Sequence, residues 1–172
     1  SNSYNTGGVV ASSAEAFSTA GGILGYVSKG SVSNSYNTGS VASTTNNYKY
    51  SYAGGVVGEI RNSGSINNSY NTGGVTSTTN SIPYSYAGGI LGGVEVNNLP
   101  VKDPSVINSS VIDSYYECTV TGGNVSSGGV SELGLANAMQ TSNYESYQGG
   151  NIFSGDLVQK TWYYSMGNHP EL

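Results

Sequence analysis

The chain repeats itself, and this internal repetition constrains its fold more than any other feature of the sequence. A seven-residue string that ends in Ser-Tyr-Asn-Thr-Gly occurs three times, and a fourth copy is degenerate. The tyrosines that mark the four copies are Tyr4, Tyr36, Tyr70 and Tyr115. A second motif, Ala-Gly-Gly-aliphatic-aliphatic-Gly, lies between the copies and begins at Ala20, Ala53 and Ala87. The two half-units alternate, which predicts one structural unit of about 33 residues that is used several times.

Each half-unit is too short and too rich in glycine to form a helix. The runs 32–36 and 66–70 alternate as short strands do, and both then stop at Asn-Thr-Gly, which is a turn signal. A unit of this size cannot bury an apolar face alone, so stacking on its neighbours must supply the core. The sequence therefore predicts an all-β fold over residues 1–131, a parallel β-solenoid (β-helix) of roughly 33-residue repeats.

Stacked strands lie about 4.8 Å apart, so equivalent residues of successive repeats are expected to form ladders of like side chains. Three structural ladders are predicted. They are a tyrosine ladder (Tyr4, Tyr36 and Tyr70), an asparagine ladder whose amides satisfy one another (Asn2, Asn34 and Asn68), and an internal aliphatic ladder (Ile23, Val56 and Ile90).

Two segments depart from the repeat. The last repeat is 11 residues longer than the one before it, and an insertion with loop composition at 94–104 accounts for the excess. Residues 132–172 lack both motifs and contain the best helix candidate, 132–140. An open end of stacked strands invites aggregation unless it is covered. We therefore expect 132–172 to be a C-terminal cap with a short helix, although a small separate domain is the alternative.

The combination of Gly-aliphatic-aliphatic-Gly with Gly-Ser-Val/Ile-x-Asn-Ser-Tyr-Asn-Thr-Gly resembles the GLUG-motif repeats. These repeats occur in large bacterial surface and secreted proteins, including some immunoglobulin-A-cleaving metallopeptidases. The resemblance covers roughly residues 1–120, and the tail from Phe153 to Leu172 looks like the segment that closes such arrays. It implies a β-solenoid segment of a longer exported chain, located at the cell surface or secreted. Because Ser1 already lies inside a motif, we expect the natural protein to continue upstream.

Composition and motifs argue against several functions. With 5 basic and 10 acidic side chains the net charge is −5, so there is no basic surface for nucleic acid. No apolar run approaches the roughly 18 residues of a membrane span, so direct membrane insertion is not expected. Cys118 and His169 are the only cysteine and histidine, and no His-Glu-x-x-His is present. We therefore expect no metal, no cofactor and no catalysis.

Carboxylates provide the best enzymatic alternative. Asp103, Asp113 and Glu117 fall near one another in the sequence, and glycoside hydrolysis needs two carboxyl groups about 5 to 9.5 Å apart. Asp113 takes the place of the ladder residues Asn34 and Asn68, however, which favours a structural role. A proline-containing loop surrounds Asp103, which favours a solvated side chain.

The strongest signal for binding is aromatic. Tyrosines precede two of the Ala-Gly-Gly motifs, and they are Tyr48, Tyr50 and Tyr52 before the first and Tyr84 and Tyr86 before the second. Residues i and i+2 of a strand share a face, so stacking would gather these rings into one patch. An exposed patch predicts a contact site for a host or environmental glycan or protein. Rings that point inward would only be packing.

These observations predict a structural or adhesive repeat segment of a large exported bacterial cell-surface protein. The segment would act as a stalk or interaction scaffold, without catalysis, and as a monomeric part of a longer chain. The alternative is a glycan-binding or glycan-cleaving β-solenoid.

Overall fold

The computed structural model describes most of the first 122 residues. The described residues are 1–46, 50–80, 85–97, 99–101, 111–112, 114–116 and 118–122. Among them the fold is all β-structure, and every strand pairing is parallel except the one between β12 and β13. In these parts of the chain no helix has the length and apolar character needed to cross a membrane.

The strands form four sheets, and each of the first three repeats contributes to all four. The first sheet holds β1 (Tyr4–Asn5), β5 (Tyr36–Asn37), β9 (Tyr70–Asn71) and β15 (Tyr115–Tyr116). The second holds β2 (Val9–Ser13), β6 (Val41–Thr45), β10 (Val75–Thr79) and β16 (Val120–Thr121). The third holds β3 (Ser18–Gly21), β7 (Ser51–Gly54) and β11 (Ser85–Gly88). The fourth holds β4 (Leu24–Ser33), β8 (Val57–Asn67), β12 (Leu91–Val96), β13 (Leu99–Val101) and β14 (Val111–Ile112).

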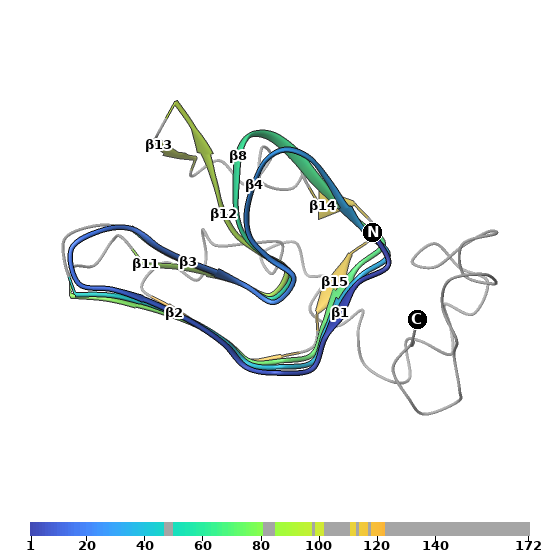
Figure 1. Cartoon of the computed structure of the whole chain (residues 1–172), viewed down its shortest axis with the longest axis horizontal. Helices are drawn as coiled ribbons and strands as arrows, with labels where there is room; N and C mark the ends of the chain where they lie inside the picture. Colours follow the sequence, from blue (N-terminus) through green and yellow to red (C-terminus); the bar gives the residue numbers. More distant parts are fainter. Residues whose placement is uncertain are drawn as a thin grey trace.

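Equivalent positions of successive repeats pair with each other, so the paths of the first three repeats nearly superimpose in Figure 1. Tyr4 pairs with Tyr36, Tyr36 with Tyr70, and Tyr70 with Tyr115. The last pairing places the degenerate fourth copy of the motif in register with the other three. The sequence repeat therefore sets the register of the sheets.

The repeats are not of equal length, and part of the difference is a bulge in β8. Val27 pairs with Ile60 but Lys29 pairs with Ser63, so the pairing of β4 with β8 shifts by one residue at this point. Asn62, which lies in the bulge, has a φ of 63°. A β-bulge bends its strand and changes the direction in which side chains point.

The predicted aliphatic ladder is confirmed. The backbone N–H of Ile23 donates to the carbonyl of Val56 at 2.9 Å, and that of Val56 donates to the carbonyl of Ile90 at 2.9 Å. Val56 and Ile90 are fully buried, and Ile23 packs against the same cluster. The buried members of this main core are Val32, Val56, Val57, Ile60, Ile66, Ile90, Leu91, Val94 and Tyr116.

The predicted tyrosine ladder is also confirmed. Its ring centroids are 5.4 Å apart between Tyr4 and Tyr36 and 5.1 Å apart between Tyr36 and Tyr70, and both pairs are stacked. This separation follows from the spacing of parallel strands, because in-register pairing places identical side chains over one another.

The asparagine ladder forms at different residues from those predicted. The side-chain N–H of Asn5 donates to Oδ1 of Asn37 at 2.7 Å, and that of Asn37 donates to Oδ1 of Asn71 at 2.7 Å. The continuous amide ladder therefore runs through the asparagines that follow the stacked tyrosines.

The prediction of an amide ladder at Asn2, Asn34 and Asn68 is wrong, because these residues serve a turn. Their φ angles are 57°, 50° and 47°, in the left-handed region that asparagine tolerates better than most residues. Oδ1 of Asn34 is buried without a hydrogen-bond partner. These asparagines align from repeat to repeat for the backbone conformation that they permit.

Close packing explains one of the recurring glycines. A Cβ atom at Gly55 would lie 2.0 Å from the carbonyl oxygen of Gly89 and 2.2 Å from Nδ2 of Asn71. Neither contact is possible for a real side chain, so the Ala-Gly-Gly motif brings the backbone against the amide ladder.

A chain of buried serine hydroxyls joins the second and third sheets. Oγ of Ser51 donates to Oγ of Ser43 at 2.9 Å, and Oγ of Ser43 donates to Oγ of Ser18 at 2.9 Å. Ser77 and Ser85 extend the same buried set into the third repeat. Alternate residues of a strand point to opposite faces, so the serines of the third sheet face the second sheet and its tyrosines face away from it.

The insertion predicted as a loop at 94–104 begins instead as a β-hairpin. Val94 pairs with Val101, and β13 runs antiparallel to β12 and projects with it from the body of the strands (Figure 1). Asn97 in the turn has a φ of 54°. Alternating apolar residues on both sides of the turn favour the hairpin. The cap at 132–172 and its helix lie outside the described residues, as does the boundary at 131.

Candidate functional site

The structure decides between the two interpretations of the tyrosine patch for the rings that it describes. Tyr52 is 0% exposed and Tyr86 is 2% exposed, and their rings stack with centroids 5.1 Å apart. Tyr50 is half-buried, with its ring 6.0 Å from that of Tyr52. Tyr48 and Tyr84 lie outside the described residues. An exposed platform that includes Tyr52 and Tyr86 is therefore wrong.

The ring of Tyr52 is buried against a glycine that lies opposite it. A Cβ atom at Gly93 in β12 would lie 2.7 Å from Cε1 of Tyr52, so the ring packs directly on the backbone of the fourth sheet. The pattern of tyrosines along the sequence gives the shared face correctly, but the fourth sheet covers that face.

The other predicted residues do not assemble into a site in the described part of the chain. Asp103, Asp113, Glu117 and His169 lie outside it. Cys118 is half-buried, and its Sγ accepts a hydrogen bond from Nδ2 of Asn71 at 3.2 Å. It therefore lies next to the last asparagine of the amide ladder. Burial raises the pKa of the Cys118 thiol to about 12, so it is protonated at neutral pH and unsuited to nucleophilic attack.

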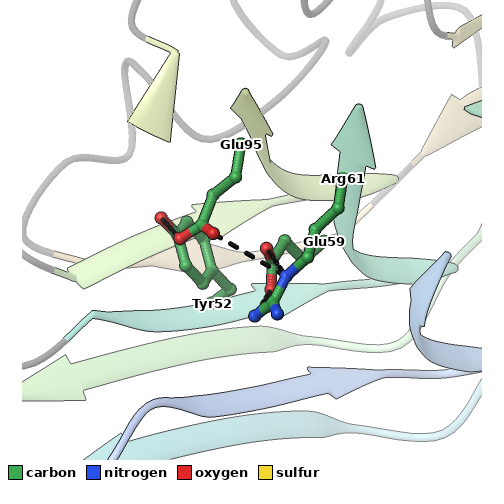
Figure 2. A network of polar contacts seen from close by, with 4 residues as sticks. All are labelled: Tyr52, Glu59, Arg61 and Glu95. Carbon is green, nitrogen blue, oxygen red and sulfur yellow. Dashed lines mark hydrogen bonds and ion pairs between the residues drawn. The ribbon is translucent and has the colours of Figure 1, made fainter. Parts of the chain in front are cut away.

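A charged cluster that the sequence did not predict lies where the third and fourth sheets meet. Figure 2 shows its four residues, Tyr52 of β7, Glu59 and Arg61 of β8, and Glu95 of β12. Glu59 is 0% exposed, Glu95 is 3% exposed, and the side chain of Arg61 is 36% exposed. Arg61 and Glu95 are paired positions of neighbouring strands, which places a positive and a negative side chain together.

Hydrogen bonds hold each of these side chains in place. Arg61 binds Glu59 in a bidentate manner, with Nε 2.5 Å from Oε1 and Nη2 3.1 Å from Oε2. Nε of Arg61 also lies 3.7 Å from Oε2 of Glu95, a distance of ion pairing without a hydrogen bond. The hydroxyl of Tyr52 donates to Oε1 of Glu95 at 2.9 Å. The cluster thus combines two carboxyl groups, one guanidinium group and one phenol.

Burial determines the protonation of these groups. The pKa of Glu59 is raised because burial disfavours its ionised form more than the hydrogen bond from Arg61 favours it, and the nearby Glu95 raises it further. The pKa of Tyr52 is raised by burial and by Glu95, so its hydroxyl stays protonated and remains a donor. The hydrogen bond to Glu59 raises the pKa of Arg61, which stays a cation.

A pocket of about 230 Å³ opens beside the cluster. It is lined by Arg61, Asn62, Glu95 and Asn97. Both asparagines have positive φ, one in the bulge of β8 and the other in the turn after β12. Cζ of Arg61 lies 5.3 Å from the centroid of the Tyr26 ring, which is 58% exposed and forms an aromatic surface next to Arg61. We name this pocket, with the cluster behind it, the Arg61 pocket.

The repeats differ from one another at the Arg61 pocket. Tyr26, Glu59 and Gly93 are equivalent positions in three successive repeats, and none resembles the others. Arg61 likewise pairs with Glu95 instead of with another arginine. The chain has only 5 basic and 10 acidic side chains, and three of them meet here. This local loss of repetition, combined with rare charged residues, is the signal in the sequence that would have indicated the site.

The described residues contain no group of three or more histidines, cysteines, aspartates or glutamates that could hold a metal ion. What the Arg61 pocket offers is hydrogen bonding. Its guanidinium group donates, its carboxylate accepts, and its two carboxamides do both.

Comparison with known proteins adds no further information: no family model, curated protein or solved structure matches this chain. The resemblance to the GLUG-motif repeats accordingly rests on the sequence motifs and remains a prediction.

Proposed function

We propose that the chain is a β-solenoid that serves as a structural or adhesive segment of a large exported bacterial surface protein. The observation that carries the proposal is the pairing of equivalent residues, parallel and in register, in all four sheets. A chain that adds one similar turn per repeat grows along a single axis. Each repeat then contacts mainly its neighbours, and the length depends on the number of repeats.

The internal ladders support a role as a scaffold. Stacked tyrosines and hydrogen-bonded asparagines join the first three repeats to one another by the same contacts. Such contacts do not depend on a ligand or on a metal. A stalk or display segment needs this kind of regular self-contained stability, and the resemblance of the motifs to GLUG repeats is what supports an exported bacterial protein.

The geometry of the carboxyl groups argues against glycan cleavage at the Arg61 pocket. A glycosidase uses two carboxyl groups that both face the substrate. Glu59 is 0% exposed and both of its oxygens are bound by Arg61, so it has no access to a substrate. Glycan or protein binding without catalysis is therefore the function that we propose for this surface.

The solenoid is tested by changing the number of repeats. Five further copies of residues 36–69 are inserted between Ser69 and Tyr70, and the particle is measured by small-angle X-ray scattering. We expect the particle to grow by about 24 Å along the stacking axis, one strand spacing per added repeat, at constant cross-section. A chain of equal length, in which the residues of the five added copies are scrambled, is the control. Growth in all three dimensions would contradict the solenoid and with it the stalk.

A further inference from the structure

We propose that the Arg61 pocket binds one pyranose ring of a neutral glycan through a pair of neighbouring hydroxyl groups. This inference rests on the adhesive role proposed above and names its ligand class. It goes beyond that role because it places the contact at Arg61, Asn62, Glu95 and Asn97, away from the buried tyrosines.

The residue at the centre of the cluster has no acidic counterpart in the first repeat. In the first repeat the position equivalent to Glu59 is Tyr26, and β4 and β8 still pair on both sides of it. Buried ion pairs contribute little to stability, since the cost of removing charges from water offsets their attraction. Three of the 15 charged side chains of the chain thus meet at one place, beside a pocket. Buried charges with altered pKa values that lie beside a pocket are typical of functional sites.

The groups that line the pocket are held in position before a ligand arrives. Tyr52 fixes one oxygen of Glu95 at 2.9 Å, and Glu59 fixes Arg61 through two contacts. The other oxygen of Glu95 lies 3.7 Å from Nε of Arg61, too far for a hydrogen bond between these two groups, and the carboxyl group of Glu95 also interacts with that of Glu59. Glu95 is only 3% exposed but lines the pocket, so a ligand hydroxyl that enters the pocket can donate to this carboxyl group and accept from the guanidinium group. Preorganised groups of this kind lower the entropic cost of binding.

The charges in the pocket favour a neutral ligand. An anion would approach Arg61 but would also meet the carboxylate of Glu95 and, behind it, that of Glu59. A metal ion bound to Glu95 would lie next to the guanidinium group of Arg61. A sugar diol matches the alternating donors and acceptors without adding charge. The carboxamides of Asn62 and Asn97 provide further donors and acceptors at the rim.

Size and the neighbouring aromatic ring are consistent with a sugar. The volume of about 230 Å³ lies below the range of roughly 300–1,000 Å³ that is usual for drug-sized ligands, so the pocket suits a single ring. The exposed Tyr26 ring, next to Arg61, offers an apolar surface with a polar tip to the ring that follows in a longer glycan.

The test uses the complete 172-residue chain on an array of neutral glycans, followed by titration with glucose, galactose, mannose and N-acetylglucosamine by NMR. Two variants remove contacts from the pocket. Glu95→Gln keeps the shape and the acceptor for Tyr52, and we expect it to weaken binding about tenfold or more because a charged acceptor is lost. Asn62→Gly combined with Asn97→Gly keeps both positive φ angles and is expected to weaken binding severalfold.

The chain offers a matched control for each variant. Glu15→Gln removes an exposed acid elsewhere, and Asn2→Gly removes an exposed asparagine with positive φ outside the pocket. Both controls should bind like the wild type, and circular dichroism should show that all variants are folded. Absence of neutral-sugar binding, or equal binding by all variants, would overturn the proposal. Binding of calcium or of a basic peptide that depends on Glu95 would overturn it as well. None of these outcomes changes the length series described above, so the two proposals fail separately.

Discussion

The first sheet and the Arg61 pocket lie in the same repeats but differ in how neighbouring repeats meet: like side chains in the sheet, unlike ones at the pocket. In the first sheet Tyr4, Tyr36 and Tyr70 stack on one another, so like side chains meet in the first three repeats. At the pocket Arg61 meets Glu95, and the backbone departs from the repeat through a bulge and a hairpin. Repetition is kept where residues stabilise one another by stacking. It is lost where the few charged residues of the chain come together. In a repetitive chain, we take such a departure from the repeat to indicate a functional site.

The largest effect is expected from the shared core, which both regions need. Ile60→Ala removes a fully buried side chain of the main cluster and should lower the free energy of unfolding by about 2–5 kcal/mol. Urea denaturation followed by circular dichroism measures the change. Val27→Ala, at the paired position of the first repeat where the side chain is half-buried, should cost clearly less. Equal losses would mean that the repeats do not share burial through stacking.

The next largest loss of stability is expected when the ion pair behind the pocket is broken. Arg61→Met leaves Glu59 buried without its partner and should cost about 3 kcal/mol at neutral pH, the low end for a broken buried pair because Arg61 is 36% exposed. Adding Glu59→Gln should restore more than half of the loss, since no buried charge then lacks a partner. Thermal and urea unfolding of the single and double variants provide the measurement. Failure of the second substitution to restore stability would show that Arg61 matters for packing alone.

Substitutions in the asparagine ladder should lower stability less, and Asn37 and Asn34 should differ clearly. Asn37→Ala removes the acceptor of Asn5 and the donor to Asn71 and should cost about 2 kcal/mol, because buried polar groups lose their partners. Asn34→Gly should be nearly neutral, because glycine keeps the φ of 50° and the buried Oδ1 of Asn34 has no partner to lose. Urea midpoints of the two variants decide the matter. Similar losses for both would restore the ladder first expected at Asn34.

The smallest effect is a dependence on pH. The pKa of Glu59 is raised in the folded state above its ordinary value of 4.5, so the folded chain binds more protons than the unfolded chain in the interval between the two pKa values. The contribution of this group to stability is therefore greatest below pH 4.5 and is lost as the pH rises through the folded pKa. Glu59→Gln removes this term, so the difference in melting temperature between wild type and variant should change over that interval. A difference that is constant with pH would contradict the shift.

Much of the fold follows from the sequence because each repeat stacks on the one before it in nearly the same conformation. Residues that recur at a constant interval must stack when equivalent strands pair, which is why the ladders of Tyr36 and Val56 were predictable. The insertion of 11 residues was predictable in length for the same reason. Leu91 pairs 34 residues from Val57, and Val111 pairs 45 residues from Ile66. No such rule shows whether an insertion forms a loop or a hairpin.

The sequence by itself thus determined the repeat, the pairing of equivalent residues, and the tyrosine and aliphatic ladders. The tertiary structure alone decided that Asn37 rather than Asn34 forms the amide ladder, that Tyr52 is buried, and that Glu59, Arg61 and Glu95 meet. The physical reason is that stacking is set by contacts between equivalent residues, which the interval along the chain reveals. The packing of the third sheet against the fourth depends on how the backbone bends between them. The interval between repeats in the sequence does not show the direction of these bends.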